Sequence, residues 1–343
     1  MSHRSPDRAG VLCAGSVMVD VSKVIDSYPA RDHVARIESV SISSGGPGLN
    51  LAVDLRRLGA EFPVALAGVI GDDEHGDLVV EECRRLGIDV ARLTRVPGGR
   101  TAFTDVMVEK IGGRRTFFHH AGVNDAMDLS TLDLSATTER IFHVGAPGLH
   151  ETMDAPLPDG GNRWARLLDA ARSAGLQTNL ELVSLQADRL REVALSCLPR
   201  LDSIVINEVE AAAMTGAEIP AGDDVDWPAM EDLARKLLAL GVRRVAVIHF
   251  PAGGVAVTAD GRSWRHGSVR LAPEQVVSTL GAGDAFASGV ILGLHEGWPM
   301  ERVLRLAVSA AAACVQSLGT SDGIRSAETC LAAAEAAGFR PVP

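Results

Sequence analysis

The chain contains the run Ser278-Thr279-Leu280-Gly281-Ala282-Gly283-Asp284-Ala285-Phe286, which precedes an apolar stretch of small residues. Gly281 and Gly283 let the backbone take φ values that other residues avoid. Asp284 is a suitable cap for a helix over about 285–294. Such a turn directs several free backbone N–H groups at one point, and the helix dipole adds to their positive potential. The run therefore predicts an anion site beside a carboxylate, as phosphoryl transfer to a hydroxyl requires.

The same run also has a plain structural interpretation, in which it is only a strand-to-helix turn capped by Asp284. It is not a Walker A loop, because no Gly-Lys-Ser/Thr follows the glycines. It is not a dinucleotide-binding fingerprint, because Gly-x-Gly-x-x-Gly is absent. Other parts of the chain have to decide between the two interpretations.

Composition limits the classes of protein that this chain can belong to. Its 343 residues are 46% hydrophobic and 22% charged, which suits a large globular core. With 33 basic and 44 acidic residues, the net charge is −11. An acidic chain without a basic run argues against nucleic acid or an anionic membrane as a partner. No apolar stretch reaches the length of a membrane helix.

The cysteines indicate a reducing compartment. Their number is odd, they are widely scattered, and no CxxC or His/Cys ligand spacing is present, so structural zinc is not expected. The apolar stretch Val11–Val21 is too short and too interrupted for a signal peptide core. We therefore expect a cytoplasmic protein with reduced thiols at Cys13, Cys83, Cys197, Cys314 and Cys330.

Strand and helix patterns alternate through most of the chain. Val11–Asp20 reads as a buried strand, and the first ten residues read as a disordered tail. After about residue 140, short apolar strands alternate regularly with helical segments. This pattern predicts an α/β fold with a mostly parallel sheet covered on both faces. We expect one domain over residues 11–337.

Three further strands do not fit a doubly covered parallel sheet, because their polar and apolar residues alternate. They lie near residues 34–43, 101–109 and 115–120 and predict a small antiparallel sheet that projects from the domain. Such a sheet beside an active site is suited to be a lid that excludes water. The alternative is an edge hairpin without a role in the site. Arg114 and Arg115 lie in this hairpin, where such side chains are more often solvated than bound to substrate.

Four motifs occur in one order along the chain, and together they resemble the ribokinase-like carbohydrate kinases of the PfkB family. The order covers nearly the whole chain. The Gly-Ala-Gly-Asp run is the most specific motif and the glycine pair before Asn50 is next. The motifs are Gly15–Asp20 after the first strand, Gly45–Asn50 at the first long helix, Asn207–Glu210 near the middle, and Gly281–Asp284.

The resemblance implies an ATP-dependent, Mg²⁺-requiring kinase that phosphorylates a hydroxyl of a sugar or sugar derivative. It assigns the base to Asp284, because a carboxylate within hydrogen-bond reach can take the hydroxyl proton as the O–P bond forms. The backbone N–H groups of Gly281, Ala282, Gly283 and Asp284 form the expected anion hole. This hole is made of backbone, so it would survive the loss of any one side chain.

The resemblance also implies residues for the two substrates. Asp20, Gly45, Gly46 and Asn50 match the sugar-binding motifs; a carboxylate accepts two hydroxyl donors, and glycines let backbone approach the ligand. The expected acceptor site continues into the lid with Phe103 and Asn124. Asn207, His249 and Gly254 match the nucleotide side, and Glu210 is the expected Mg²⁺ residue. Asn207 and Glu210 are spaced by three, so their side chains share one helical face.

Two departures from the family pattern concern a monovalent cation. The family usually has aspartate where this chain has Ser278, and a serine where it has Gly323. We expect activation by potassium to be weakened or absent. A third departure is His249, which replaces a small hydroxyl residue of the nucleotide loop.

Two other functions stay open at this stage. A nucleoside kinase of the same fold would use Asp20 and Asn50 equally well, on a ribose. A sugar- or nucleotide-binding regulator without catalysis is motivated by Ser278 and His249, although the intact Gly-Ala-Gly-Asp run argues against it. In each case we expect small-molecule ligands, no nucleic acid and no membrane, and a homodimer formed through the lid would cover its exposed edge.

Overall fold

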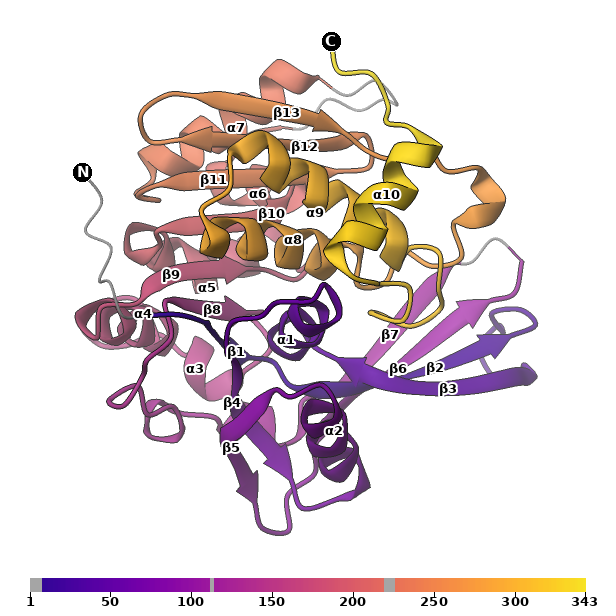
Figure 1. The fold of residues 1–343 in the computed structure, drawn as a ribbon. Coiled ribbons are helices and arrows are strands. Elements are labelled where there is room, and N and C mark those ends of the chain that lie inside the picture. The colour runs from indigo at the N-terminus through magenta and orange to yellow at the C-terminus, as the bar shows by residue number, and fades with distance from the viewer. Residues whose placement is uncertain (1–7, 112–113, 219–225) are drawn as a thin grey trace.

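The computed structural model describes residues 8–111, 114–218 and 226–343, and its main element is a sheet of nine strands. Their order is β13-β12-β11-β10-β9-β8-β1-β4-β5 (Figure 1). Pairing is parallel from β5 through β11 and antiparallel at β12 and β13. The strands are β1 Val11–Gly15, β4 Val64–Gly71, β5 Asp89–Val96, β8 Ile141–Gly145, β9 Gln177–Glu181, β10 Ser203–Asn207, β11 Val245–Phe250, β12 Gly253–Thr258 and β13 Ser263–Gly267.

Helices cover both faces of this sheet, as Figure 1 shows, and each face has its own apolar core. One face carries α1 Pro47–Arg57, α2 Glu74–Arg85, α8 Ala282–Glu296, α9 Met300–Cys314 and α10 Ala327–Ala337. The other carries α3 Glu151–Asp154, α4 Arg163–Ser173, α5 Ala187–Ala194, α6 Glu208–Thr215 and α7 Trp227–Ala239. Short 3₁₀ turns lie at η1 Gly122–Ala126, η2 Leu129–Thr131, η3 Leu195–Arg200 and η4 Pro273–Gln275. The doubly covered α/β fold is confirmed.

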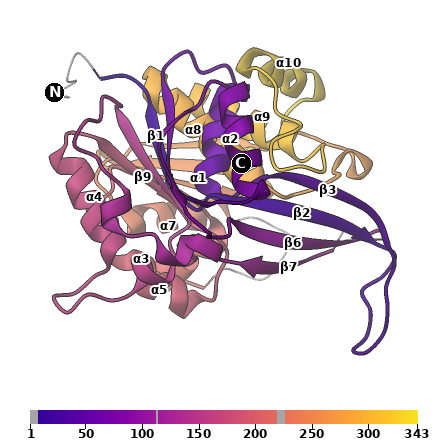
Figure 2. The ribbon, with the colours of Figure 1, turned by 90° about the horizontal axis from the view of Figure 1, so that it is seen from below.

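The lid is a separate sheet of four strands that projects from the main domain (Figure 2). Its order is β3-β2-β6-β7, with β2 and β6 parallel and the other pairs antiparallel. The strands are β2 Met18–Ile25, β3 Ile37–Gly45, β6 Ala102–Glu109 and β7 Arg115–His120. The expected lid is therefore present, with one strand more than the pattern predicts.

The extra lid strand comes from an incorrect prediction at the start of the chain. Val11–Asp20 is not one strand: β1 ends at Gly15, and β2 begins at Met18 in the other sheet. Gly15 has φ +115°, and its Cα lies against the carbonyl of Gly145, so the chain turns where only glycine fits. Apolar residues continue on both sides of this turn, and the sequence pattern therefore predicts a single strand.

Two smaller expectations also differ from the structure. The sequence predicts a disordered tail over residues 1–10, of which positions 1–7 lie outside the described residues. Gly10, however, is buried, and its N–H donates to His295 Nε2 at 2.8 Å. Strand β5 was not predicted, because its half-buried residues do not alternate cleanly. Among the described residues, no helix is long and apolar enough to span a membrane.

Candidate active site

The candidate site lies where parallel strands end and α8 begins. Strands β8, β9, β10 and β11 all present their carboxyl ends to this edge of the sheet, where ligands of open α/β sheets bind. Glu181 and Asn207 are the last residues of β9 and β10. The motifs that the sequence singled out converge here from both ends of the chain.

The start of α8 differs from the prediction in one respect. Gly281, not Asp284, is the N-cap, and it adopts the left-handed conformation with φ +77°. A side chain at Gly281 would clash with the carbonyl of Thr320, so glycine is required. Asp284 therefore sits in the first turn of the helix, where a carboxylate interacts favourably with the dipole.

This turn leaves three backbone donors free for a ligand. The Ala282 N–H donates to the Thr279 carbonyl at 3.3 Å, and the Ala285 N–H donates to the Gly281 carbonyl at 2.8 Å. Within the described residues, the N–H groups of Gly281, Gly283 and Asp284 have no hydrogen-bond acceptor. Of the four donors that the sequence predicts, only that of Ala282 is already engaged, and the other three lie at the turn that carries the Asp284 carboxylate.

The Asp284 carboxylate contacts α1 directly. Asn50 Nδ2 donates to Asp284 Oδ2 at 2.6 Å, and Asn50 itself is buried. Asp20 of β2 lies nearby, with its carboxylate over the Cα of Gly45: a Cβ at Gly45 would be 2.5 Å from Asp20 Oδ2. Gly46 is the N-cap of α1 and has φ +87°. The two glycines therefore let the sugar-side carboxylate and helix α1 approach one another.

Both aspartates titrate far from their usual range. The pKa of Asp284 is raised to about 7. Burial is the main cause and the charge of Glu181 adds to it, whereas the hydrogen bond from Asn50 opposes the shift. Burial also raises the pKa of Asp20 to about 7, helped by the charge of Asp284. Two carboxyl groups that repel one another's charge are a common feature of sites that transfer protons.

Glu181 and Glu210 are a second pair of carboxyl groups near Asp284. Asn207 and Glu210 form a reciprocal cap of α6, with the Glu210 N–H donating to Asn207 Oδ1 at 2.8 Å and the Asn207 N–H to Glu210 Oε2 at 3.1 Å. Burial raises the pKa of Glu210 to about 7. Glu181 is also buried, and burial together with the charge of Glu210 raises its pKa well above the usual range.

Glu181 and His143 were missed by the sequence analysis. His143 Nδ1 is 2.7 Å from Asn179 Oδ1, and its Nε2 is 3.3 Å from Glu181 Oε1. Burial lowers the pKa of His143 to about 4, so the ring is neutral and the pair carries no full ion-pair charge. A signal for Glu181 existed, because it is a carboxylate at the carboxyl end of a parallel strand.

A cavity of about 560 Å³ adjoins the free N–H groups at the start of α8. Its lining includes Asn207, His249, Ala282 and Gly283, and its other polar residues are Glu208, Ser268, Thr279 and Arg340. Most of the lining is apolar and includes Val269, Leu271, Val276, Val308, Ala311, Ala312 and Val315. A mainly apolar pocket that adjoins free N–H groups suits a ligand that has a flat ring and an anionic tail.

The two residues of the nucleotide loop behave differently. His249 lines the cavity, and burial lowers its pKa to about 4, so the ring is neutral near pH 7. Gly254 does not line it: a Cβ there would be 2.7 Å from Cζ of Phe286, so this glycine makes room for a core ring. Of these two residues only His249 lines the cavity, together with Phe250, Pro251 and Gly253 of the same loop.

Phe103 and Asn124 lie at the lid side of the site. Phe103 of β6 stacks on His120 with ring centroids 5.1 Å apart and meets His75 edge-on. Asn124 of η1 is buried, and its Nδ2 donates to the carbonyl of Val17 at 3.2 Å, at the junction between β1 and β2. Asn124 Oδ1 has no partner among the described residues. Among the described residues, Asn124 forms no hydrogen bond with Asp284.

This combination of an anion hole, a carboxylate within it and an adjoining cavity defines a phosphotransferase of the α/β class. The sequence profile described as "pfkB family carbohydrate kinase" matches residues 8–327. The chain belongs to this family of carbohydrate kinases. The Gly-Ala-Gly-Asp motif and the resemblance drawn from it are thereby confirmed at the level of the family.

Known relatives agree in length and architecture. The ATP-dependent ribose-1-phosphate kinase of Halopiger xanaduensis is 30% identical over 93% of this chain and 95% of its own. The 5-dehydro-2-deoxygluconokinase of Clostridium perfringens is 26% identical over 91% of this chain and 90% of its own. The Arabidopsis thaliana ribokinase solved with ribose and ATP is 21% identical and has a TM-score of 0.77, covering 96% of this chain and 99% of that one. The last comparison establishes the fold.

The hydrogen bond between Asn50 and Asp284 gives the first prediction. Replacing Asn50 with Ala removes a donor that stabilises the ionised Asp284, so the pKa of Asp284 should rise from about 7 by roughly one unit. Titration of ¹³C-labelled aspartate carboxyls by NMR measures this, with Asp284→Asn identifying the resonance. An unchanged or lower pKa in Asn50→Ala would show that the bond does not act on Asp284.

Proposed function

We propose that this protein transfers the γ-phosphoryl group of ATP to a hydroxyl of a sugar or sugar derivative. The observation that carries the proposal is the placement of the Asp284 carboxylate beside the unengaged N–H groups of Gly283 and Asp284. One small region then holds a base for the acceptor hydroxyl and donors for the transferred group. Membership of the pfkB family supports the same chemistry.

Asp284 is the proposed general base. A sugar hydroxyl is a very weak acid, so its proton must leave as the O–P bond forms, and a carboxylate with a pKa near 7 can accept it. Asn50 holds Oδ2 of this carboxylate by a 2.6 Å hydrogen bond, which leaves the other oxygen for the acceptor. The base is thereby oriented by α1 while the donors come from α8.

Asp20 is the proposed partner of the acceptor. Its carboxylate can accept hydrogen bonds from two neighbouring hydroxyl groups, which suits a polyol. Gly45 allows Asp20 to lie against the backbone where α1 begins, and Phe103 with the two histidines beside it offers an apolar surface for a sugar ring. Asn124, with an unpartnered Oδ1, completes the proposed acceptor side.

ATP is the proposed donor and occupies the 560 Å³ cavity. The apolar residues of the cavity would contact the adenine ring, and Asn207 and His249 would face the phosphates. The γ-phosphoryl group would then reach the N–H groups of Gly283 and Asp284, where the helix dipole favours negative charge. His249 is neutral, so it serves as a hydrogen-bonding group and not as a fixed cation.

The residues present fit a Mg²⁺ ion bound together with the nucleotide. Glu210 is a buried carboxyl group with no basic partner among the described residues, and its pKa is raised by burial, as expected for a site completed by a cation. Glu210 would hold the ion partly through water, with Asn207 fixing its orientation. When bound, Mg²⁺ neutralises phosphate charge during transfer.

We also propose a homodimer through the lid. Lid edge strands β3 and β7 expose large apolar side chains, whose exposed fractions are 56% for Val40, 52% for Ile42, 53% for Phe117 and 51% for Phe118. Exposed apolar edge strands invite pairing with another chain, and a second copy of this sheet would cover them. Location in the cytoplasm remains a prediction from the free cysteines.

A panel of acceptors tests the proposed function. With Mg-ATP and a panel of pentoses, hexoses, their phosphates and nucleosides, we expect ADP release with at least one sugar or sugar derivative. Turnover with nucleosides alone would instead make the protein a nucleoside kinase. Tight ligand binding without ADP release from any acceptor would favour the non-catalytic regulator.

Asp284→Asn tests the base. The change keeps the shape of the side chain and the backbone donors, so ATP affinity and folding should persist while kcat falls by at least about 100-fold. Asp72→Asn, on an exposed loop carboxylate, is the matched control and should retain normal kcat. Turnover of Asp284→Asn within a few-fold of the wild type would remove Asp284 from this role.

The pH profile tests the same residue without mutation. The base acts when ionised, and the pKa of Asp284 in the free protein is about 7, so kcat/KM should fall about tenfold per pH unit below that value. A kcat/KM that stays flat down to pH 5 would contradict this assignment.

A further inference from the structure

The place expected for a monovalent cation lacks two of the family's usual ligands in this chain. Ser278 is buried and its Oγ accepts the Leu280 N–H at 3.2 Å, so this position supplies neither a charge nor an oxygen directed away from its own turn. Gly323 supplies no hydroxyl, and a side chain there would clash with the carbonyl of Ala313. Both departures from the family pattern, at Ser278 before α8 and at Gly323 after α9, thus fit the local structure around them.

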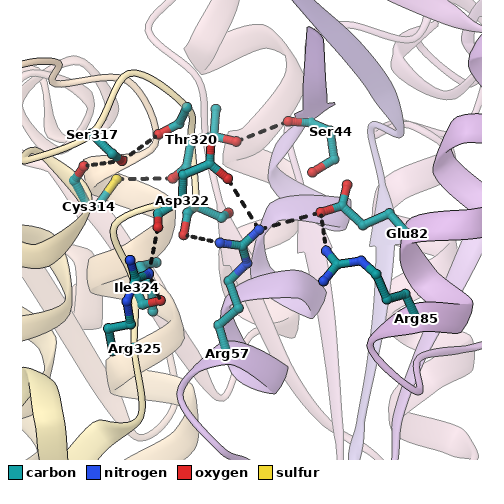
Figure 3. A network of polar contacts seen from close by, with 12 residues as sticks. Ser44, Arg57, Glu82, Arg85, Cys314, Ser317, Thr320, Asp322, Ile324 and Arg325 are labelled. Atoms are coloured by element: carbon teal, nitrogen blue, oxygen red, sulfur yellow. Dashed lines mark hydrogen bonds and ion pairs between the residues drawn. The ribbon is translucent and has the colours of Figure 1, made fainter. Parts of the chain in front are cut away.

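Protein donors already occupy the carbonyl groups around this turn. Cys314 Sγ lies 3.3 Å from the Leu280 carbonyl and 3.0 Å from the Thr320 carbonyl. Ser317 Oγ lies 3.1 Å from the Cys314 carbonyl and 3.2 Å from the Gly319 carbonyl (Figure 3). The thiol and the hydroxyl can each donate to one of the two carbonyl oxygens beside them, and so they compete with a cation for these oxygens.

Two ties from α1 and β3 fix the loop in this closed arrangement. Arg57 of α1 donates through Nη1 to the Ser321 carbonyl at 2.9 Å, and Thr320 Oγ1 donates to the Ser44 carbonyl at 3.0 Å (Figure 3). Asp54 is the nearby carboxyl group. Both of its oxygens are buried without a hydrogen-bond partner among the described residues, and burial raises its pKa well above the usual range. A cation bound at this place would therefore depend on Asp54.

A positive side chain reaches the same place from the lid. Arg115, the first residue of β7, lines a small cavity together with Val277, Ser278, Leu280 and Leu318. Among the described residues its guanidinium has no hydrogen bond or ion pair, although the side chain is half-buried. Burial lowers the pKa of Arg115, whereas the adjacent Cys314 acts against that shift. The neighbouring Arg114 is exposed, as the sequence predicted for both.

We propose that Arg115 is a positioning residue that supplies a fixed positive charge beside the Ser278–Gly281 turn, in place of a monovalent cation. An arginine stays charged even when partly buried. The charge strengthens the potential at the free N–H groups of α8. Because Arg115 belongs to the lid, this support is present only while the lid lies against residues 277–280. The inference rests on the proposed kinase function.

The test compares Arg115→Ala with Arg114→Ala, a matched change one residue away on the exposed side. The affinity for the non-hydrolysable analogue AMP-PNP, measured by calorimetry with Mg²⁺, should weaken about tenfold in Arg115→Ala and stay unchanged in Arg114→Ala. Turnover with the acceptor found in the panel should fall at least about tenfold in Arg115→Ala. Arg115→Lys keeps the charge and should retain most of the affinity, which separates charge from packing.

Added cations distinguish a charge effect of Arg115 from a purely structural one, because they can replace a missing charge but not a missing packing contact. About 20 mM guanidinium should restore much of the lost AMP-PNP affinity in Arg115→Ala and leave the wild type unchanged. Wild-type turnover should be equal in potassium and in tetramethylammonium at one ionic strength. Wild-type affinity in Arg115→Ala, or potassium activation that disappears in Asp54→Asn, would overturn the proposal. AMP-PNP binding does not require turnover, so a protein inactive with every acceptor would still report on Arg115.

Discussion

One hydrogen bond, from Asn50 Nδ2 to Asp284 Oδ2, joins the two halves of the site. It connects residues 234 positions apart in the chain and links α1, which follows the lid strand β3, to α8, which carries the anion hole. The two helices also pack against one another on the same face of the sheet. Because the carboxylate is held from one helix and the backbone donors come from the other, the geometry of the site depends on this contact.

The second constraint is the number of carboxyl groups in a small space. Asp20, Asp284, Glu181 and Glu210 are all shifted to higher pKa, mainly by burial, and the charges on several of them raise one another's pKa. Without ligands such a cluster is partly protonated near neutrality. Under the proposed function, Mg²⁺ and the acceptor hydroxyls bind to these carboxyl groups and favour their ionised form. Substrate binding and ionisation of the base are therefore coupled.

The fold and the central motif could be predicted from the sequence because both depend on local patterns. Alternating strands and helices fix a parallel sheet, and the spacing of Gly281, Gly283 and Asp284 fixes a turn that offers backbone N–H groups. The pattern could not show that Gly281 caps α8, because that depends on the Thr320 carbonyl of a distant loop. It could not show that β2 leaves the main sheet, because the apolar letters continue across Gly15.

The residues that the pattern misplaced or missed depend on tertiary contacts. Gly254 is required because the ring of Phe286 lies against it. Glu181 becomes part of the site because β9 extends as far as Glu181 at its carboxyl end. Arg114 and Arg115 are the same residue type in adjacent positions, but Arg115 begins β7 and lines the small cavity beside Ser278, whereas Arg114 precedes the strand and is exposed. Side-chain direction in a lid strand cannot be read from composition.

The most direct measurement is a structure of the protein with Mg-ADP, aluminium fluoride as the phosphoryl mimic, and the acceptor that the panel identifies. The account predicts that the mimic accepts hydrogen bonds from the N–H groups of Gly283 and Asp284 at about 2.7–3.1 Å. It also predicts that the acceptor hydroxyl lies within hydrogen-bond distance of Asp284. A mimic bound away from the start of α8, or an acceptor hydroxyl far from both Asp284 oxygens, would contradict it.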